Sequence, residues 1–379
     1  MSLITDNNIL KDVCNKLSKS SFIAIDTEFM RENTYWPKLC LIQLATPTYN
    51  AIIDPLASGI DLKPLDDIME NKEIIKVFHA CRQDLEIFYN RNKKLPKPIA
   101  DTQILGMVCG FGDSVSYEIL SKELINKKVD KFSRFTDWTR RPLTQRQINY
   151  ALEDVIYLTE IYQKLLKKVS ENNREEWINE EMNNLCNLSN FSLDPKNAWK
   201  KIKVKNLNQR FASNLKAAAQ WRESEAQKKN IPKNRILKDE SLVQLAANIP
   251  KNEIEFKKIR GISKNSLSSN KIKDLINSLK RAELINKNEL PIKSNYKFKK
   301  HSLIELLKVL LKLKCEENFV SENLVASSKD LKKLAIEDNP EILALKGWRY
   351  DIFGKDALEL KKGNLYMTIK EDKIFIKKL

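Results

Sequence analysis

The segment "FIAIDTEF", residues 22–29, constrains the fold and the chemistry of this chain more than its composition does. Four apolar residues predict a buried β-strand, and two acids, Asp26 and Glu28, follow at once. Residues two apart on a strand point to the same face, so the two carboxylates converge. Their repulsion is relieved by a divalent cation, which prefers carboxylate oxygens. The alternative is a strand that ends in a solvated loop with both acids in water.

Short apolar runs and helical patterns alternate over the first half of the chain. Further strands are predicted at 39–46, 51–55 and 74–80, and helices at 81–91, 101–110, 114–124 and 143–169. This order predicts an α/β domain with a mixed sheet flanked by helices. Helical patterns without strand alternation then continue through most of the second half of the chain, which predicts all-α domains there. The tail, 363–379, alternates apolar and polar residues as a hairpin does.

The chain length and two polar junctions predict several domains. With 379 residues, the chain is too long for one ordinary domain. We predict an α/β domain over 1–190, a linker over 191–206, an all-α domain over 207–286, a second linker over 287–300, and a second all-α domain with a C-terminal tail over 301–379.

Positive charge gathers in the middle of the chain. The formal net charge is +17, and residues 201–300 hold 25 Lys and Arg against nine Asp and Glu. A genome-wide bias towards Lys would spread evenly, so it does not explain this concentration. A basic domain beside a near-neutral one indicates a surface that binds a polyanion. Lys233 and Arg235 lie in its basic stretch "KKNIPKNRILK" and are candidate phosphate contacts, although such runs can also be a solvated face.

The sequence predicts neither membrane attachment nor a cysteine-based site. It contains no run of about 18 apolar residues, and its first residues lack the basic-then-apolar pattern of a signal peptide. The six cysteines are scattered without a CxxC pair, which argues against a zinc site and a disulfide framework. We therefore expect a cytoplasmic protein, with a monomer as the default state.

Two more acids stand where they can join the first pair. Asp84 opens the helix after the predicted strand 74–80, and Asp154 lies four residues after Tyr150 on one face of the long helix. Four carboxylates and a tyrosine suit a site with two divalent cations about 3.5–4 Å apart, which clamp an in-line phosphoryl displacement. The chain has only two histidines and no Walker A loop, so an NTP-driven motor is not expected.

Three stretches resemble the exonuclease motifs of the DEDD superfamily. They are "DTEF" (26–29), "VFHACRQDLEIF" (77–88) and "NYALEDVIYL" (149–158), the last with the Tyr-x-x-x-Asp spacing of the tyrosine branch. Within that branch "DWTRRPLTQRQINYALEDVIYL" (137–158) is similar to the signature of the ribonuclease D family. The stretch "QWRESEAQKKNIPKNRILKDESL" (220–242) resembles the start of an HRDC domain, and a weaker second HRDC-like segment ends in "GWRYDIFGKDAL".

This resemblance implies an activity and a role for each motif residue. It implies a 3′–5′ exoribonuclease that releases 5′-mononucleotides from tRNA precursors and other structured RNA 3′ ends, as in tRNA 3′ maturation. Two Mg²⁺ or Mn²⁺ ions would be bound by the acids, and a tyrosine would position the attacking water. The residues implied are Asp26, Glu28, Asp84 and Asp154 for the metals and Tyr150 for the water.

Residues near the acids are candidates for holding the RNA end. Phe29 and Tyr35 can stack on bases, with core packing as the alternative. Arg31 can contact a phosphate or form an ion pair of the fold. His79 can orient a carboxylate or a water, or be a structural histidine. Asp101 is interpreted as a helix cap rather than as a fifth ligand.

Two other functions remain open from the sequence. A DNA-directed 3′–5′ exonuclease would use the same motifs, although no polymerase or helicase segment accompanies them. A non-catalytic RNA-binding protein on a nuclease fold would need a broken carboxylate set, and all five motif positions are intact.

Overall fold

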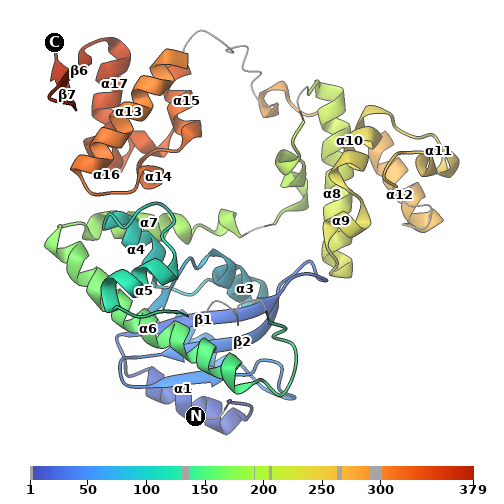
Figure 1. Cartoon of the computed structure of the whole chain (residues 1–379). Coiled ribbons are helices and arrows are strands. Elements are labelled where there is room, and N and C mark those ends of the chain that lie inside the picture. Colours follow the sequence, from blue (N-terminus) through green and yellow to red (C-terminus); the bar gives the residue numbers. More distant parts are fainter. Residues whose placement is uncertain (1–2, 130–135, 192, 205–206, 263–266, 291–300) are drawn as a thin grey trace.

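The computed structural model describes the chain except residues 1–2, 130–135, 192, 205–206, 263–266 and 291–300. Figure 1 shows an α/β domain built from the N-terminal half and two helical domains that contact different parts of it. The predicted fold class, an α/β domain with a mixed sheet followed by helical structure, is thus confirmed. Among the described residues, no helix combines the length and apolar character needed to cross a bilayer.

A five-stranded mixed sheet forms the centre of the α/β domain, in the order β3-β2-β1-β4-β5. The strand β1 pairs antiparallel with β2 and parallel with β4, so the strand that carries the acid pair lies in the middle of the sheet. The strands are β1 (Phe22–Met30), β2 (Lys38–Ala45), β3 (Asn50–Ile53), β4 (Ile75–Phe78) and β5 (Ile99–Asp101).

Helices flank this sheet, and the predicted ones are present. They are α1 (Asn7–Leu17), α2 (Lys63–Glu70), α3 (Arg82–Asn92), α4 (Thr102–Val108), α5 (Tyr117–Ile125), α6 (Gln145–Glu171) and α7 (Glu175–Leu185). Thr144 caps α6, and Gln147 returns a hydrogen bond to the cap. Asp101 caps α4 by accepting from the backbone N–H of Gln103, which confirms its interpretation as a cap.

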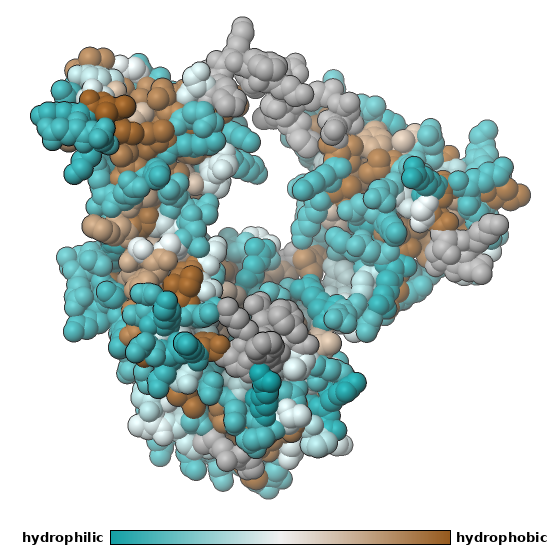
Figure 2. All heavy atoms as spheres, in the orientation of Figure 1, coloured by the Kyte–Doolittle hydropathy of each residue, from teal (hydrophilic) through white to brown (hydrophobic). Residues whose placement is uncertain are grey.

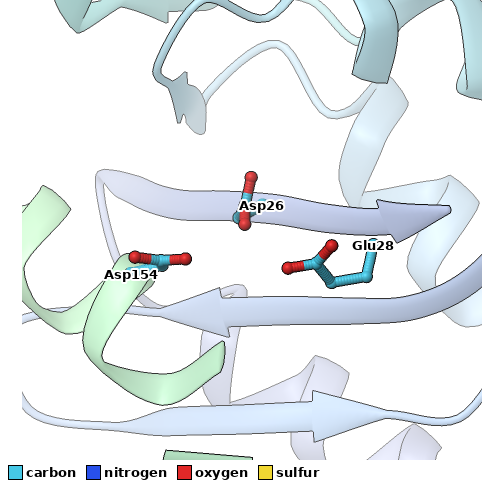
Figure 3. A group of neighbouring side chains, drawn as sticks. All are labelled: Asp26, Glu28 and Asp154. Carbon is cyan, nitrogen blue, oxygen red and sulfur yellow. The ribbon is translucent and has the colours of Figure 1, made fainter. Parts of the chain in front are cut away.

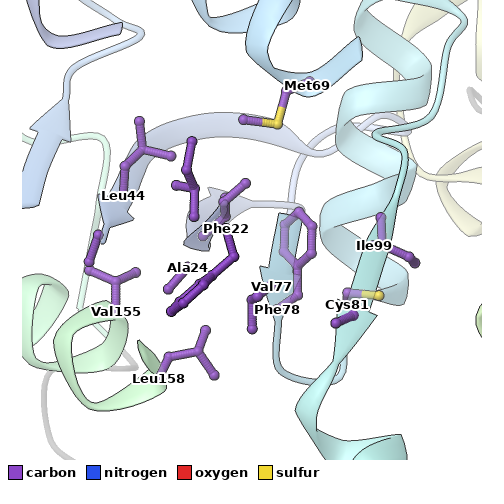
Figure 4. Packing of buried hydrophobic residues seen from close by; sticks show 14 of the residues in the cluster. Phe22, Ala24, Leu44, Met69, Val77, Phe78, Cys81, Ile99, Val155 and Leu158 are labelled. Atoms are coloured by element: carbon purple, nitrogen blue, oxygen red, sulfur yellow. The ribbon is translucent and has the colours of Figure 1, made fainter. Parts of the chain in front are cut away.

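The helix α6 crosses the sheet and packs on β1, β2 and β3. Figure 4 shows its Val155 and Leu158 against Phe22 and Ala24 of β1, all of them buried. Burial of such aliphatic and aromatic side chains supplies most of the stability of a core. Because Val155 is fixed in this core, the residue before it, Asp154, is held beside β1.

The first helical domain packs around one long helix. Its helices are α8 (Gln209–Lys229), α9 (Lys233–Ile236), α10 (Asp239–Ala247), α11 (Glu253–Lys257) and α12 (Ser269–Lys280). The 3₁₀ helix η3 (Pro195–Lys201) places Trp199 in the same core. Part of the segment 191–206, predicted as a linker, is therefore packed structure, because its tryptophan is buried against the helices.

The second helical domain ends in a hairpin, as predicted for the tail. It contains α13 (His301–Glu317), α14 (Glu322–Val325), α15 (Ser328–Ile336), α16 (Gly347–Arg349), the π-helix η6 (Tyr350–Gly354), α17 (Lys355–Lys362), β6 (Leu365–Lys370) and β7 (Lys373–Lys378). The domain docks on α7, where Trp177 and Trp348 stack with ring centroids 4.3 Å apart. Arg349 is buried there and pairs with Glu180 at 2.6 Å and with Glu181.

Candidate active site

The central strand β1 presents Asp26 and Glu28 on one face of the sheet. Asp26 is opposite Gln43 of β2 and Glu28 is opposite Leu41, so the acids lie inside the paired part of the strand and not in a solvated loop. The pairing shifts register between Glu28 and Phe29. The interpretation of the acids as part of a strand is therefore confirmed, and the alternative of a free loop is excluded.

Asp154 reaches the same place from α6. Carboxylate oxygens of Asp26, Glu28 and Asp154 all lie within 4.8 Å of one another. In Figure 3 these three side chains approach one another from the strand and the helix. Burial raises the pKa of Asp26 to about 6, opposed by a hydrogen bond from the backbone of Thr27.

This arrangement fits a divalent cation. Three partly exposed carboxylates with oxygens within 4.8 Å of one another repel each other when all are ionised. Hard cations with carboxylate ligands remove that conflict, and carboxylate and water oxygens are the ligands that Mg²⁺ and Mn²⁺ take. The chemistry of the donor set is thus that of a divalent metal site.

The fourth predicted acid, Asp84, lies next to this group but outside it. It is in the first turn of α3, is buried, and accepts a hydrogen bond from the hydroxyl of Thr27. Burial and then the charge of Asp26 raise its pKa well above its usual range. The bond to Thr27 attaches α3 to β1 directly beside Asp26.

Tyr150 stands one helical turn before Asp154 and hydrogen-bonds to it. Burial is the largest cause of its raised pKa, followed by the charge of Asp154 and then by that of Glu28. The phenol therefore stays protonated over the physiological range and acts as a hydrogen-bond donor. Its ring lies 6.1 Å from the buried ring of Trp138, which supports its orientation.

A further tyrosine, Tyr117, supports α6 at the site, and the sequence analysis missed it. Its hydroxyl donates to the backbone carbonyl of Asp154, and its ring meets the ring of His79 edge-on at 5.5 Å. His79 is 3.0 Å from the hydroxyl of Thr102, and burial lowers its pKa. His79 thus packs against the ring of Tyr117. The only sequence signal for Tyr117 was its place after Ser116, the N-cap of α5.

The two candidates that follow the acids on β1 have different surroundings. Phe29 is partly exposed and belongs to none of the four hydrophobic clusters formed by the described residues. Arg31 forms a two-fold hydrogen bond with Glu86 of α3, at 2.9 and 2.8 Å. Phe29 therefore follows the acids on β1 with an accessible side chain, whereas Arg31 is part of an ion pair that joins the end of β1 to α3.

The remaining candidates lie at the contact with the first helical domain. Tyr35 is buried in the core of that domain, and its hydroxyl donates to Glu223 of α8. Its ring is therefore not available for stacking on a base in this structure. Arg235 donates to Asn33, and Lys233 is partly exposed at the start of α9. None of these three residues lies in the carboxylate group.

Comparison with known proteins places the whole chain in one family. A 3′–5′ exonuclease family model matches residues 1–170, and the HRDC domain model matches residues 212–278. Ribonuclease D of Zymomonas mobilis is 43% identical over 378 residues, which cover 98% of this chain and 97% of the relative. The chain belongs to the ribonuclease D family of 3′–5′ exoribonucleases. Ribonuclease D of Bartonella henselae is 42% identical over the full chain and 94% of its own length.

A solved structure agrees with this family assignment. It is described as Escherichia coli RNase D, an exoribonuclease involved in structured RNA processing. It superposes with a TM-score of 0.81 at 29% identity and covers 96% of this chain and 98% of its own. The predicted family, the exonuclease domain and the first HRDC domain are confirmed. The HRDC character of residues 301–379 stays a prediction.

Proposed function

We propose that this member of the ribonuclease D family hydrolyses the last phosphodiester bond of an RNA 3′ end and releases 5′-mononucleotides one at a time, with two Mg²⁺ or Mn²⁺ ions. The observation that supports the proposal is the convergence of Asp26, Glu28 and Asp154 within 4.8 Å. These acids stand in the stretches that resemble the DEDD exonuclease motifs. Asp84, beside Asp26, is the fourth proposed ligand. Bound ions of this kind lower the pKa of water and stabilise the leaving oxygen.

The residues of the chain supply orientation and charge. Tyr150 is a protonated donor hydrogen-bonded to Asp154, so its hydroxyl can hold a water at the acids. Thr27 and Tyr117 fix the positions of Asp84 and of the helix that carries Asp154. Such preorganised groups lower the barrier because they need not reorganise during the reaction.

We propose that Phe29 stacks on the terminal base. Its side chain is partly exposed beside the acids, and base–aromatic stacking suits any sequence because every base has a π-face. Lys233 and Arg235, in the region that carries 25 Lys and Arg against nine acids, are proposed to contact the RNA backbone. Arg31 and His79 are proposed to act only by supporting α3 and Tyr117.

Structured RNA 3′ ends, including those of tRNA precursors, are the proposed substrates, since a relative in E. coli is described as processing structured RNA. All six cysteines are free thiols, which fits a reducing compartment, and we place the reaction in the cytoplasm. A monomer is proposed, because one chain supplies the complete carboxylate group.

The test is a cleavage assay on a 5′-labelled tRNA precursor with a short 3′ trailer, a matched DNA strand and Mg²⁺, with an EDTA control. The expected result is a ladder that shortens from the 3′ end of the RNA, with 5′-mononucleotides in the supernatant and no product in EDTA. Faster trimming of DNA would favour a DNA-directed exonuclease. Intact RNA despite tight binding would favour a non-catalytic RNA-binding protein.

A further inference from the structure

The C-terminal hairpin has two faces of different character. Strands β6 and β7 pair from Leu365↔Lys378 to Lys370↔Lys373, and successive side chains point to opposite faces. On the inner face Leu365 is buried in the core of the second helical domain, and Met367 and Ile376 pack against that core. These three residues anchor the base of the hairpin to the domain, whereas Ile369 and Ile374, nearer the turn on the same face, are 73% and 38% exposed.

The outer face combines aromatic and basic side chains. Tyr366 is 42% exposed and Phe375 is 45% exposed, although both could have faced the core had the register shifted by one residue. The residues of this outer face are Tyr366, Thr368, Lys370, Lys373, Phe375 and Lys377. Three of these six residues are lysines and none is an acid; the two acids of the hairpin, Glu371 and Asp372, occupy the turn, where Glu371 pairs with Lys370 at 3.8 Å.

The two rings are neighbours across the strands. Tyr366 is opposite Lys377 and Phe375 is opposite Thr368, so the two residues occupy diagonal positions of the hairpin, which are typically about 7–8 Å apart. Lysines on an isolated hairpin can be explained by solubility, whereas two exposed aromatic rings on one face of it are a candidate contact surface. In Figure 2 hydrophobic and hydrophilic side chains adjoin at the end of the domain where Figure 1 places β6 and β7.

We propose that this outer face is a second RNA contact, on which Tyr366 and Phe375 stack with unpaired bases while Lys370, Lys373 and Lys377 contact phosphates. Rings set among cations are the arrangement that holds single-stranded nucleic acid. Figure 1 places the hairpin on the side of the second helical domain away from the sheet, so it contacts parts of the RNA remote from the reacting end. The proposal rests on the proposed function, because RNA is the polyanion.

The test compares two variants of the outer face with one of the inner face. The double variant Tyr366→Ala/Phe375→Ala removes the rings, and Lys370→Glu/Lys373→Glu/Lys377→Glu reverses the charge without touching the core. Ile369→Ser is the control, since this side chain is 73% exposed on the inner side of the same hairpin. RNA affinity is measured by fluorescence anisotropy in Ca²⁺ on a long precursor and on a short oligonucleotide.

For both outer-face variants we expect a Kd for the long precursor at least about fivefold higher, and an unchanged Kd in the control. Trimming of the short oligonucleotide should stay at the wild-type rate, and photocrosslinks from 4-thiouridine RNA should map to 365–378. Wild-type affinity in both outer-face variants, or the absence of hairpin crosslinks, would overturn the proposal. If neither the wild type nor any variant trims the short oligonucleotide, the proposed function itself is wrong. The affinity measurements still test whether the hairpin binds RNA, because they do not depend on cleavage.

Discussion

The carboxylate group and the first helical domain differ in how they distribute charge. In the first, three acids from β1 and α6 converge within 4.8 Å. In the second, residues 201–300 hold 25 Lys and Arg, of which Lys233 and Arg235 on α9 are two, so the positive charge is shared among many side chains. Concentrated charge makes each residue indispensable, whereas distributed charge lets many residues share one task. We therefore expect single substitutions to affect kcat strongly in the first region and KM weakly in the second.

The largest effect is expected at the carboxylate group. Asp154→Asn removes one charge from the three, and kcat should fall by about a thousandfold or more because a metal ligand is lost. RNA affinity in Ca²⁺ should remain near that of the wild type. The control is Glu153→Gln, one residue earlier on α6 and outside the carboxylate group, which should retain activity. If Asp154→Asn kept full activity, the site assignment would be wrong.

A smaller effect is expected from removal of the Tyr150 hydroxyl. Tyr150→Phe keeps the ring beside Trp138 but loses the hydroxyl that is bonded to Asp154. We expect kcat to fall by about a hundredfold with KM nearly unchanged, as is typical for loss of a group that orients a proton. Single-turnover rates with saturating enzyme measure this. A rise in KM alone would show that Tyr150 binds substrate rather than positions water.

The contact between the α/β domain and the first helical domain gives the third prediction. Tyr35→Phe removes the donor to Glu223, whose other carboxylate oxygen is buried without a partner among the described residues. We expect the free energy of unfolding to fall by about 1–3 kcal/mol. The loss should be rescued in part by Glu223→Gln in the same chain. Denaturant titrations of the wild type, the two single variants and the double variant give the coupling free energy between Tyr35 and Glu223. If the two single-variant losses in the free energy of unfolding simply added up in the double variant, the hydrogen bond between these residues would contribute nothing.

The smallest effect is expected in the basic region. Lys233→Ala/Arg235→Ala should raise KM by roughly two- to tenfold. The slope of log binding constant against log salt concentration should become shallower by about one to two, which corresponds to the loss of one or two phosphate contacts. The rate at saturating RNA should be unchanged. Titrations at several salt concentrations measure the slope. A fall in kcat at saturating RNA would remove the contrast drawn between the two regions.

The sequence predicted what depends on local spacing. Asp26 and Glu28 share a face because strands have a period of two, and Tyr150 and Asp154 share one because they are a helical turn apart. The caps at Thr144 and Asp101 were equally local. These features follow from backbone geometry, so tertiary packing did not alter them.

The sequence could not predict contacts between distant segments. Tyr35 follows the acids closely, and the sequence left base stacking and core packing both open for it; it packs against α8 through a partner 188 positions away. Tyr117 meets Asp154 across 37 positions. The burial of Trp199 likewise depends on helices that come later in the chain. Each required the fold before its role could be seen.

The most direct test of the account uses sulfur at the scissile phosphate. RNA with a single phosphorothioate at its last linkage is incubated with wild-type protein in Mg²⁺ or in Mn²⁺, and release of the terminal nucleotide is timed. Because Mn²⁺ accepts sulfur better than Mg²⁺ does, one diastereomer should be cut at least about a hundredfold slower in Mg²⁺ and be largely restored by Mn²⁺. Equal rates for sulfur and oxygen substrates in both metals, with activity surviving EDTA, would contradict a metal site at Asp26, Glu28 and Asp154.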